Sequence, residues 1–193
     1  LQAQINPHFL YNTLNTIVWM ADRAKTPDIG RLAAELGTFF RIGLSQGVEM
    51  IRLGEEANHV RAYLEVQRFR YGDSLSYSLD LDPALAELYC LKLFVQPLVE
   101  NAIYHGVKEI DRPGVIRIGI GTNAGRPEAV TIEVEDNGMG IAPDQLERIN
   151  PRLETPSPGA GGGYGSFNVH ERLRLAHGDG YGLSLASEAG AWT

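Results

Sequence analysis

The spacing of apolar residues changes character at Gly72, and this change limits the possible folds more than any other feature of the chain. Before Gly72, apolar residues recur at helical intervals in three runs, at residues 1–24, 27–43 and 55–71. After Gly72, strand-like runs appear at residues 74–81, 114–122, 129–135 and 181–187. We therefore predict an α+β chain with two domains: a helical region at residues 1–72, and a layer of strands with helices on one side at residues 73–193.

Helical spacing returns within the second domain, at residues 91–106, 144–150 and 166–177. Residues 151–165 contain three prolines and five glycines, a composition that predicts a mobile loop. The glycine-rich end of this loop leads directly into the last predicted helix.

Composition excludes several classes of protein. The net charge is −7 and the basic residues do not cluster, so we expect no nucleic-acid surface. A single cysteine, Cys90, excludes an internal disulfide and a cysteine-based zinc site, and it fits a reducing cytoplasm. The sequence begins without methionine inside a helical pattern. We therefore expect a cytoplasmic fragment of a sensor protein that reaches the membrane only through an upstream region.

The first two helical runs are expected to form an antiparallel hairpin. Leu10, Leu14, Ile17 and Ala21 recur on one side of the first helix, and Thr26-Pro27 is typical of the start of the second. A two-helix hairpin leaves an apolar face uncovered. We expect this face to pair with a second copy as a four-helix bundle, which predicts a homodimer.

His8 lies on the polar side of the first helix, opposite the leucine stripe. An exposed neutral imidazole is a competent nucleophile, and Asn12, four residues later, can bind a ring nitrogen and select its tautomer. An isolated surface histidine usually has no role. The function of His8 therefore depends on whether the rest of the chain supplies a group that it can attack.

The first of three nucleotide-binding elements is the run Glu100-Asn101-Ala102-Ile103-Tyr104-His105. On a regular helix Asn101 and His105 share one side, which places an amide oxygen suited to Mg²⁺ beside an imidazole that can touch phosphate. Glu100 is a candidate general base or a residue that orders a water molecule.

The other two elements are rich in glycine. Asp136 follows a strand and is suited to accept a hydrogen bond from an adenine amino group, while Gly138 and Gly140 allow a close turn around the base. Gly161, Gly163 and Gly165 lead into a helix, an arrangement that can cradle phosphates. Each element alone is weak, but their order along the chain predicts an ATP site without a Walker loop.

These motifs resemble a known family. Residues 1–72, through Gln4-Ile5-Asn6-Pro7-His8-Phe9-Leu10-Tyr11-Asn12, look like the phosphoacceptor region of LytS/YehU-type sensor histidine kinases. Residues 73–193 resemble the GHKL ATPase domain, an α/β sandwich. The resemblance implies an ATP-dependent kinase that phosphorylates its own His8 and passes the phosphoryl group to an aspartate in the receiver domain of a response regulator.

The resemblance also implies roles for individual residues. Asn101 would coordinate Mg²⁺, with Glu100 and His105 around the phosphates, and Asp136 and Thr193 would hold the adenine. Two positions depart from the family pattern: Ser166 stands where the family usually has leucine, and Tyr164 where it usually has a smaller aliphatic residue. Both changes bear on how the glycine-rich lid closes over the nucleotide.

Two alternative functions remain open at this point. The chain can be a nucleotide-binding module that mainly removes phosphate from a response regulator, or an ATPase of the same fold that forms no phosphohistidine. The motif around His8 argues against the second alternative. The input signal, the identity of the regulator and the choice between transfer within one chain or across a dimer are not encoded in these motifs.

Overall fold

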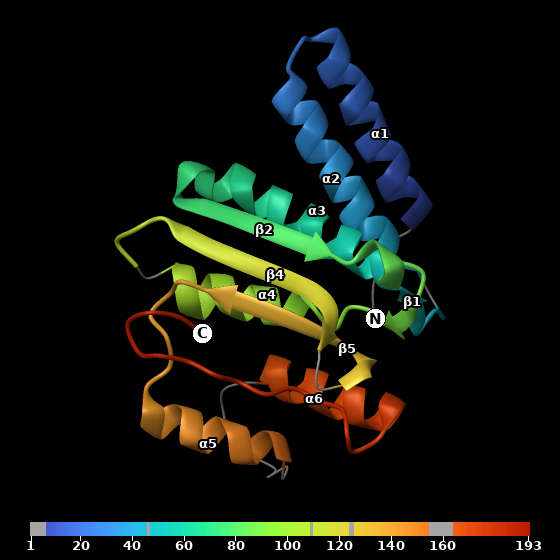
Figure 1. The fold of residues 1–193 in the computed structure, drawn as a ribbon. Helices are drawn as coiled ribbons and strands as arrows, with labels where there is room; N and C mark the ends of the chain where they lie inside the picture. The colour runs from blue at the N-terminus through green and yellow to red at the C-terminus, as the bar shows by residue number, and fades with distance from the viewer. Residues whose placement is uncertain (1–6, 46, 109, 124–125, 155–163) are drawn as a thin grey trace, which may run out of the picture. The chain divides into compact units, whose positions relative to one another are not determined.

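The computed structural model describes residues 7–45, 47–108, 110–123, 126–154 and 164–193 (Figure 1). Contacts divide the chain into two compact units, Leu1–Gly72 with Pro83–Leu93, and Asp73–Asp82 with Phe94–Thr193. The segment Pro83–Leu93 therefore belongs with the helical unit by its contacts, although it follows the expected domain boundary at residue 72. That boundary stays a prediction.

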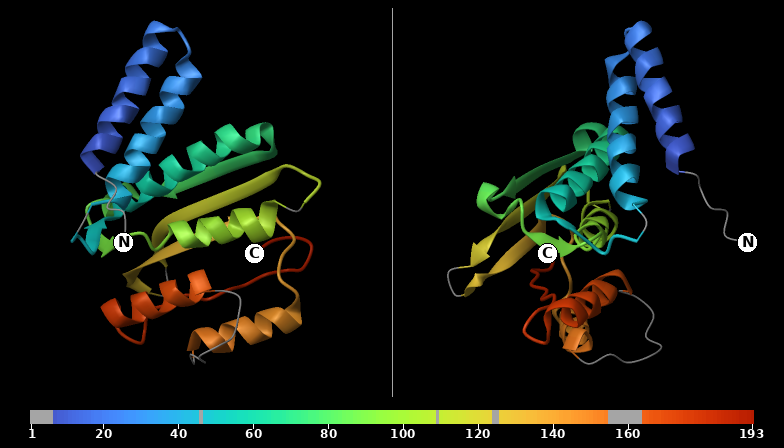
Figure 2. Two further views of the ribbon diagram at one scale, coloured as in Figure 1. Left: turned by 180° about the vertical axis from the view of Figure 1, so that it is seen from behind. Right: turned by 90° about the vertical axis from the view of Figure 1, so that its right-hand side faces the viewer.

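The first unit begins with a helical hairpin, α1 (Pro7–Arg23) and α2 (Pro27–Gly43) (Figures 1 and 2). Leu14 and Ala21 are buried, and a Cβ on Gly30 would lie 3.5 Å from the Cβ of Ala21, so the two helices approach closely. Ile17 is 37% exposed. The predicted stripe is thus only partly covered within one chain.

The first unit also contains α3 (Leu53–Tyr71) and a small two-stranded sheet. The strands β1 (Met50–Arg52) and β3 (Tyr89–Leu91) are antiparallel. Lys92 follows β3, and its Nζ donates hydrogen bonds to the carbonyls of Gly43 at 3.0 Å and Ser45 at 2.7 Å. The ammonium group satisfies carbonyls that the end of α2 leaves without helical partners.

The second unit is built on a three-stranded sheet in the order β2-β4-β5. Its strands are β2 (Leu75–Leu81), β4 (Gly114–Asn123) and β5 (Arg126–Asp136), with β2 parallel and β5 antiparallel to β4. Alternate residues of the central strand are buried, namely Ile116, Ile118 and Ile120. Two short 3₁₀ turns, η1 (Gly72–Ser74) and η2 (Pro83–Leu85), flank β2 in the sequence.

Three helices and one π-helical segment accompany this sheet. They are α4 (Gln96–Asn101), the π segment η3 (Ala102–Val107), α5 (Pro143–Glu154) and α6 (Tyr164–His177). The π segment contacts β4 and β5, and α6 contacts both α4 and α5 (Figures 1 and 2). The predicted apolar face of the first of these helices is buried, at Val95, Val99, Ala102 and Ile103.

Several predicted boundaries are wrong. The helix expected at 91–106 starts at Gln96, because Leu91 is paired in β3 and Pro97 is suited to the first turn of a helix. The loop expected at 151–165 is shorter, because α5 continues to Glu154 and α6 begins at Tyr164. Residues 155–163 lie outside the described residues.

The strand predicted at 181–187 is also wrong, because side chains occupy its backbone groups. The Leu183 N–H donates to Nδ1 of His170 at 3.0 Å. Nδ2 of Asn150 donates to the Leu185 carbonyl at 3.0 Å, and Oδ1 of Asn150 accepts the Leu185 N–H at 3.3 Å. The segment is thus held without a ladder, and an isolated bridge between Glu188 and Trp192 follows it.

The architecture is α+β as predicted, with a helical N-terminal region followed by a mixed sheet with helices. Within the described part of the chain, no helix combines the length and the apolar character needed to cross a bilayer.

Candidate active site

Asp136 ends β5 and anchors a tight turn. Its side chain is only 4% exposed, and Oδ1 accepts the N–H of Gly138 at 2.8 Å. Burial raises the pKa of Asp136, and the hydrogen bond from Gly138 opposes that rise. The neighbouring Asn137 fixes the turn on β4, accepting the Val115 N–H at 2.7 Å and donating to the Pro113 carbonyl at 3.1 Å.

Two glycines bring this turn against the π-helical segment. A Cβ on Gly106 would meet Oδ1 of Asp136, and a Cβ on Gly138 would meet the backbone of Gly106. The Met139 N–H donates to the Gly106 carbonyl at 3.2 Å. The two backbones therefore touch directly, and any side chain at either glycine would separate them.

Thr193 lies beside Asp136, as the predicted adenine site requires. Asp136 and Thr193 exchange backbone hydrogen bonds in both directions, at 2.9 and 3.2 Å. The hydroxyl of Ser187 lies 3.0 Å from that of Thr193 and accepts the N–H of Ile141 at 2.7 Å. Gly140 has φ +65°, and a Cβ there would meet the Glu188 carbonyl, so this position also requires glycine.

Asn101 is in contact with the first turn of α6. Its Nδ2 donates a hydrogen bond to Oγ of Ser166 at 2.9 Å. A Cβ on Gly165 would lie 3.8 Å from the same Nδ2 and 3.9 Å from Oδ1. The structure thus brings together the first and third predicted elements of the nucleotide signature at Asn101 and Gly165, whereas Gly161 and Gly163 fall outside the described residues.

Glu100 and His105 flank Asn101 along the chain. Gln96 donates to the Glu100 carboxylate at 2.8 Å, and His105 is exposed. The sequence placed Asn101 and His105 on one side of a regular helix, but the helix turns into a π segment at Ala102. Because π-helical bonds run from i to i+5, the four-residue spacing no longer repeats one turn.

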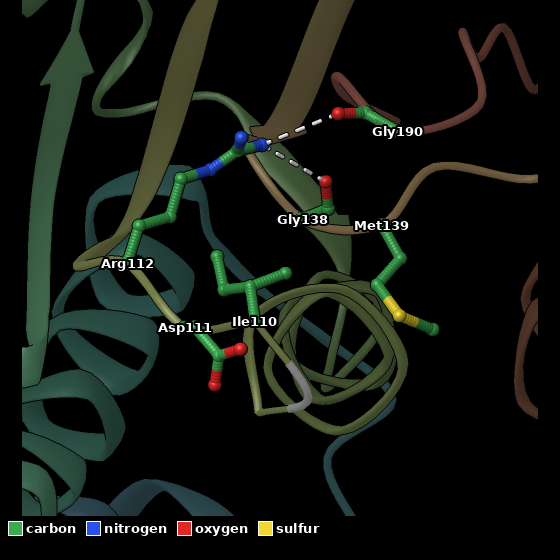
Figure 3. A pocket seen from close by; sticks show the side chains of 6 residues that line it. All are labelled: Ile110, Asp111, Arg112, Gly138, Met139 and Gly190. Carbon is green, nitrogen blue, oxygen red and sulfur yellow. Dashed lines mark hydrogen bonds between the residues drawn. The ribbon is translucent and has the colours of Figure 1, made fainter.

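Arg112 lies in the candidate site, although no sequence motif indicated it. Its Nη2 donates to the carbonyl of Asn137 at 2.7 Å. The same nitrogen donates to the carbonyls of Gly138 at 3.3 Å and Gly190 at 3.5 Å (Figure 3). It therefore joins the turn after Asp136 to the chain segment before Thr193. Arg112 also lines a pocket of about 430 Å³ together with Ile110, Asp111, Gly138, Met139 and Gly190.

His8 belongs to the first unit and is exposed on α1. Nδ2 of Asn12 lies 3.3 Å from Nδ1 of His8, so the predicted contact between the two side chains is present. The bond engages Nδ1, and Nε2 is the ring nitrogen on the opposite edge of the imidazole.

The donor set at Asn101 fits Mg²⁺ bound through a nucleotide, rather than a metal held by the protein alone. Among the residues that the structure describes, no three His, Cys, Asp or Glu side chains group as metal ligands. Mg²⁺ at phosphate sites usually takes only one or two protein ligands, and its remaining positions go to phosphate oxygens and water. With Nδ2 of Asn101 bonded to Ser166, Oδ1 is the amide atom left to meet a cation.

Comparison with protein families matches both parts of the chain. Residues 1–75 match the family described as histidine kinase, and residues 90–193 match the histidine kinase-, DNA gyrase B-, and HSP90-like ATPases. A histidine kinase domain from the blue-light activated histidine kinase EL346 of Erythrobacter litoralis aligns with a TM-score of 0.50 over 96% of this chain and 92% of that domain. At 15% identity this likeness concerns the fold alone.

Three similar relatives are bacterial sensor proteins. The chain is 40% identical over 188 residues to sensor histidine kinase YesM of Bacillus subtilis, covering 97% of this chain and 30% of YesM. It is 36% identical to sensor histidine kinase YpdA of Escherichia coli, over 93% of this chain and 30% of YpdA. It is also 36% identical to LytS of Streptococcus mutans, over 97% of this chain and 31% of LytS.

The chain thus spans less than a third of the length of these relatives. The matches confirm the resemblance read from the motifs and the expected ATPase fold of the second part. The order of the two matches, histidine kinase first and ATPase second, also agrees with the order of the predicted motifs along the chain. The chain belongs to the LytS-type sensor histidine kinases, and its residues 90–193 form an ATPase domain of the histidine kinase, DNA gyrase B and HSP90 kind.

Proposed function

We propose that this chain transfers the γ-phosphoryl group of ATP to Nε2 of His8 and then to an aspartate of a response regulator. The observation that carries the proposal is the pairing of Asp136 with Thr193 in the same unit in which Asn101 meets the helix after the glycine-rich segment. One domain would thereby supply both an adenine site and a phosphate site. The whole kinase would act in the cytoplasm, where ATP is available, with its sensor part elsewhere in the protein.

His8 has to present a lone pair on Nε2 at the moment of transfer. In the structure Nδ2 of Asn12 faces Nδ1, which favours the tautomer with its proton on Nε2. If the Asn12 amide rotates by 180°, Oδ1 faces the imidazole instead and accepts a hydrogen bond from a protonated Nδ1 of His8. In that tautomer Nε2 carries the lone pair, which faces outward. We propose that Asn12 selects the reactive tautomer in this way.

The transfer itself makes one bond and breaks one. The Nε2 lone pair forms the bond to the γ-phosphorus, while the bond from that phosphorus to the bridging oxygen breaks and its electrons leave with ADP. The imidazole then loses its Nδ1 proton, and Glu100 is our candidate for the base that takes it, directly or through water. Bound Mg²⁺ would neutralise charge on the phosphates.

The nucleotide would be held by residues from all three elements. Asp136 uses Oδ1 for the Gly138 N–H, so we assign Oδ2 to the adenine amino group, with Thr193 alongside. Asn101 would bind Mg²⁺ through Oδ1, and His105 would contact phosphate. Gly161, Gly163 and Gly165 would form the lid, with Gly138 and Gly140 keeping the base close to the backbone.

We further propose that the kinase is a homodimer joined through α1 and α2. Dimerisation and a response-regulator partner are what membership of the histidine kinases implies. Large apolar side chains on this hairpin remain exposed in a single chain, among them Phe9 at 71%, Trp19 and Met20 at 58%, and Ile29 at 53%. Covering them would remove a large apolar surface from water. A sedimentation mass of one chain would contradict the dimer.

Phosphate labelling tests the proposed reaction. Incubation with γ-labelled ATP and Mg²⁺ should give an acid-labile, alkali-stable label on the wild-type chain, and none on a His8→Gln variant. Label that survives this substitution would overturn the assignment of His8. Nucleotide binding without any label, together with faster loss of phosphate from a regulator, would instead support the phosphatase alternative.

A further inference from the structure

The first turn of α6 carries a hydroxyl that contacts the proposed Mg²⁺ ligand. Ser166 Oγ accepts a hydrogen bond from Nδ2 of Asn101 at 2.9 Å, across 65 positions of sequence. Building on the function proposed above, we propose that Ser166 is a positioning residue for Asn101. It holds the amide so that Oδ1 faces the nucleotide-bound metal, and it thereby links Mg²⁺ binding to the helix that follows the lid.

The chemistry of a carboxamide explains why such a partner matters. Only the oxygen of the Asn101 amide can ligate a cation, whereas its NH₂ group would repel one and needs an acceptor. An amide without a fixed partner turns between two orientations, and one of these presents the wrong atom. Hydrogen bonds from outside the ligand shell are the usual means of holding a metal ligand in the productive orientation.

The local packing supports the same role. Both Asn101 and Ser166 are half-buried, so water competes less for their polar groups than it would at the surface. A Cβ on Gly165 would lie 3.8 Å from Nδ2 of Asn101, an ordinary van der Waals distance, so the residue before Ser166 also lies beside the amide. Contacts between α4 and α6 bring the two residues together from separate elements.

The resemblance described from the motifs leads us to expect leucine where this chain has Ser166. A leucine side chain offers no acceptor to the Asn101 NH₂ group. The orientation of Asn101 by Ser166 is thus a property that the family pattern would not supply. It ties the metal ligand to α6, so a displacement of α6 would release the amide.

Nucleotide titration separates this role from general packing. ADP affinity is measured by calorimetry on the full chain, once with saturating Mg²⁺ and once with EDTA. Ser166→Ala should lose about 10-fold or more of the affinity in Mg²⁺, as expected when the outer partner of a metal ligand is removed, and should match the wild type in EDTA. Ser166→Thr retains the hydroxyl and should restore the Mg²⁺-dependent affinity.

A double substitution and a matched control complete the experiment. If Ser166 acts through Asn101, adding Ser166→Ala to Asn101→Ala should cause no further loss in Mg²⁺. Ser76→Ala removes another serine hydroxyl of the same unit, one that donates a part-buried hydrogen bond to the Gly114 carbonyl at 3.3 Å, and should leave both affinities unchanged.

Each outcome bears on a different statement. A Ser166→Ala variant with wild-type affinity for ADP in Mg²⁺ would overturn the positioning role. Equal losses in Mg²⁺ and in EDTA would overturn it too, because they would show that Ser166 only supports the fold. A wild-type chain that binds no ADP under either condition would refute the proposed function itself.

Discussion

Arg112 is the residue that joins the turn after Asp136 to the segment before Thr193. Replacing it with methionine tests how much it stabilises the proposed adenine site. Methionine keeps most of the aliphatic stem and removes the guanidinium. The variant therefore loses the bonds to the carbonyls of Asn137, Gly138 and Gly190 while changing little else.

The size of the effect follows from the geometry. All three bonds leave one nitrogen, Nη2, which carries only two hydrogens, so at most two carbonyls are bonded well at once. The bond to Asn137 is short at 2.7 Å, whereas those to Gly138 and Gly190 are long at 3.3 and 3.5 Å. A hydrogen bond from a charged group contributes about 1.5–3 kcal/mol. Because Arg112 is exposed, we expect about 1–2 kcal/mol.

The assay is urea unfolding of the wild type and Arg112→Met, followed at a signal from the second unit, with ADP affinity measured in parallel. The free energy of unfolding should fall by about 1–2 kcal/mol. The same energy sets the upper limit for the loss of ADP affinity, about 5–30-fold, since a disordered loop lowers the fraction of chains competent to bind.

A nearby arginine supplies the control. Arg117 pairs with Glu135 at 2.8 Å on the surface of the sheet, and both side chains are at least half exposed. Arg117→Met should cost less than about 1 kcal/mol and leave ADP affinity unchanged, as is usual for exposed ion pairs. If Arg112→Met is no less stable than this control, the reasoning about how Arg112 stabilises the turn after Asp136 is refuted.

Three further changes test other parts of the structure. Gly106→Ala should lower the free energy of unfolding by about 1–3 kcal/mol in calorimetry, because its Cβ would meet Asp136, and wild-type stability would contradict this contact. Burial raises the pKa of Asp136, so the folded chain holds the carboxyl proton more tightly than the unfolded chain does, and stability is lost as the pH rises through the folded pKa. Asp136→Asn cannot ionise and should therefore have a higher melting temperature than the wild type at neutral pH. This difference should disappear in acid, where Asp136 is protonated. Burial, followed by Glu56 and Glu55, raises the pKa of Cys90 to about 12, so iodoacetamide should label the folded chain far more slowly than the urea-unfolded chain.

The sequence predicted the parts of the fold that depend on burial of a repeating face. Val95, Val99 and Ile103 are buried as their spacing indicated, although the helix that carries them ends in a π segment. A change of hydrogen-bond register from i+4 to i+5 leaves almost no trace in an apolar pattern, because it depends on packing against the sheet.

The failed strand at 181–187 has a different cause. Alternating apolar residues report which side of an extended segment is covered, but not what bonds its backbone. Here the partners are the side chains of His170 and Asn150, which lie 13 and 35 positions away in sequence. No local pattern distinguishes this arrangement from a strand in a sheet.

The residues of the candidate site also differ in whether a local sequence pattern pointed to them. Asp136 and Asn101 were predicted as site residues because each sits in a short motif, and the contacts of Asp136 with Thr193 are present in the structure. Arg112 and Ser166 had no such signal for a role, since their partners lie 25 and 65 positions away. The only trace of Ser166 in the sequence is its departure from the leucine of the family pattern.

The contact between Gly106 and Gly138 has a consequence for protein design. The last turn of one helix and the turn after a strand are in direct backbone contact. Both positions must therefore be glycine at the same time, although they lie far apart in the sequence. Grafting the run from Asp136 to Gly140 onto another sheet would fail unless the recipient also has a helix that ends in a glycine opposite the grafted turn. The two motifs can be transplanted only as a pair.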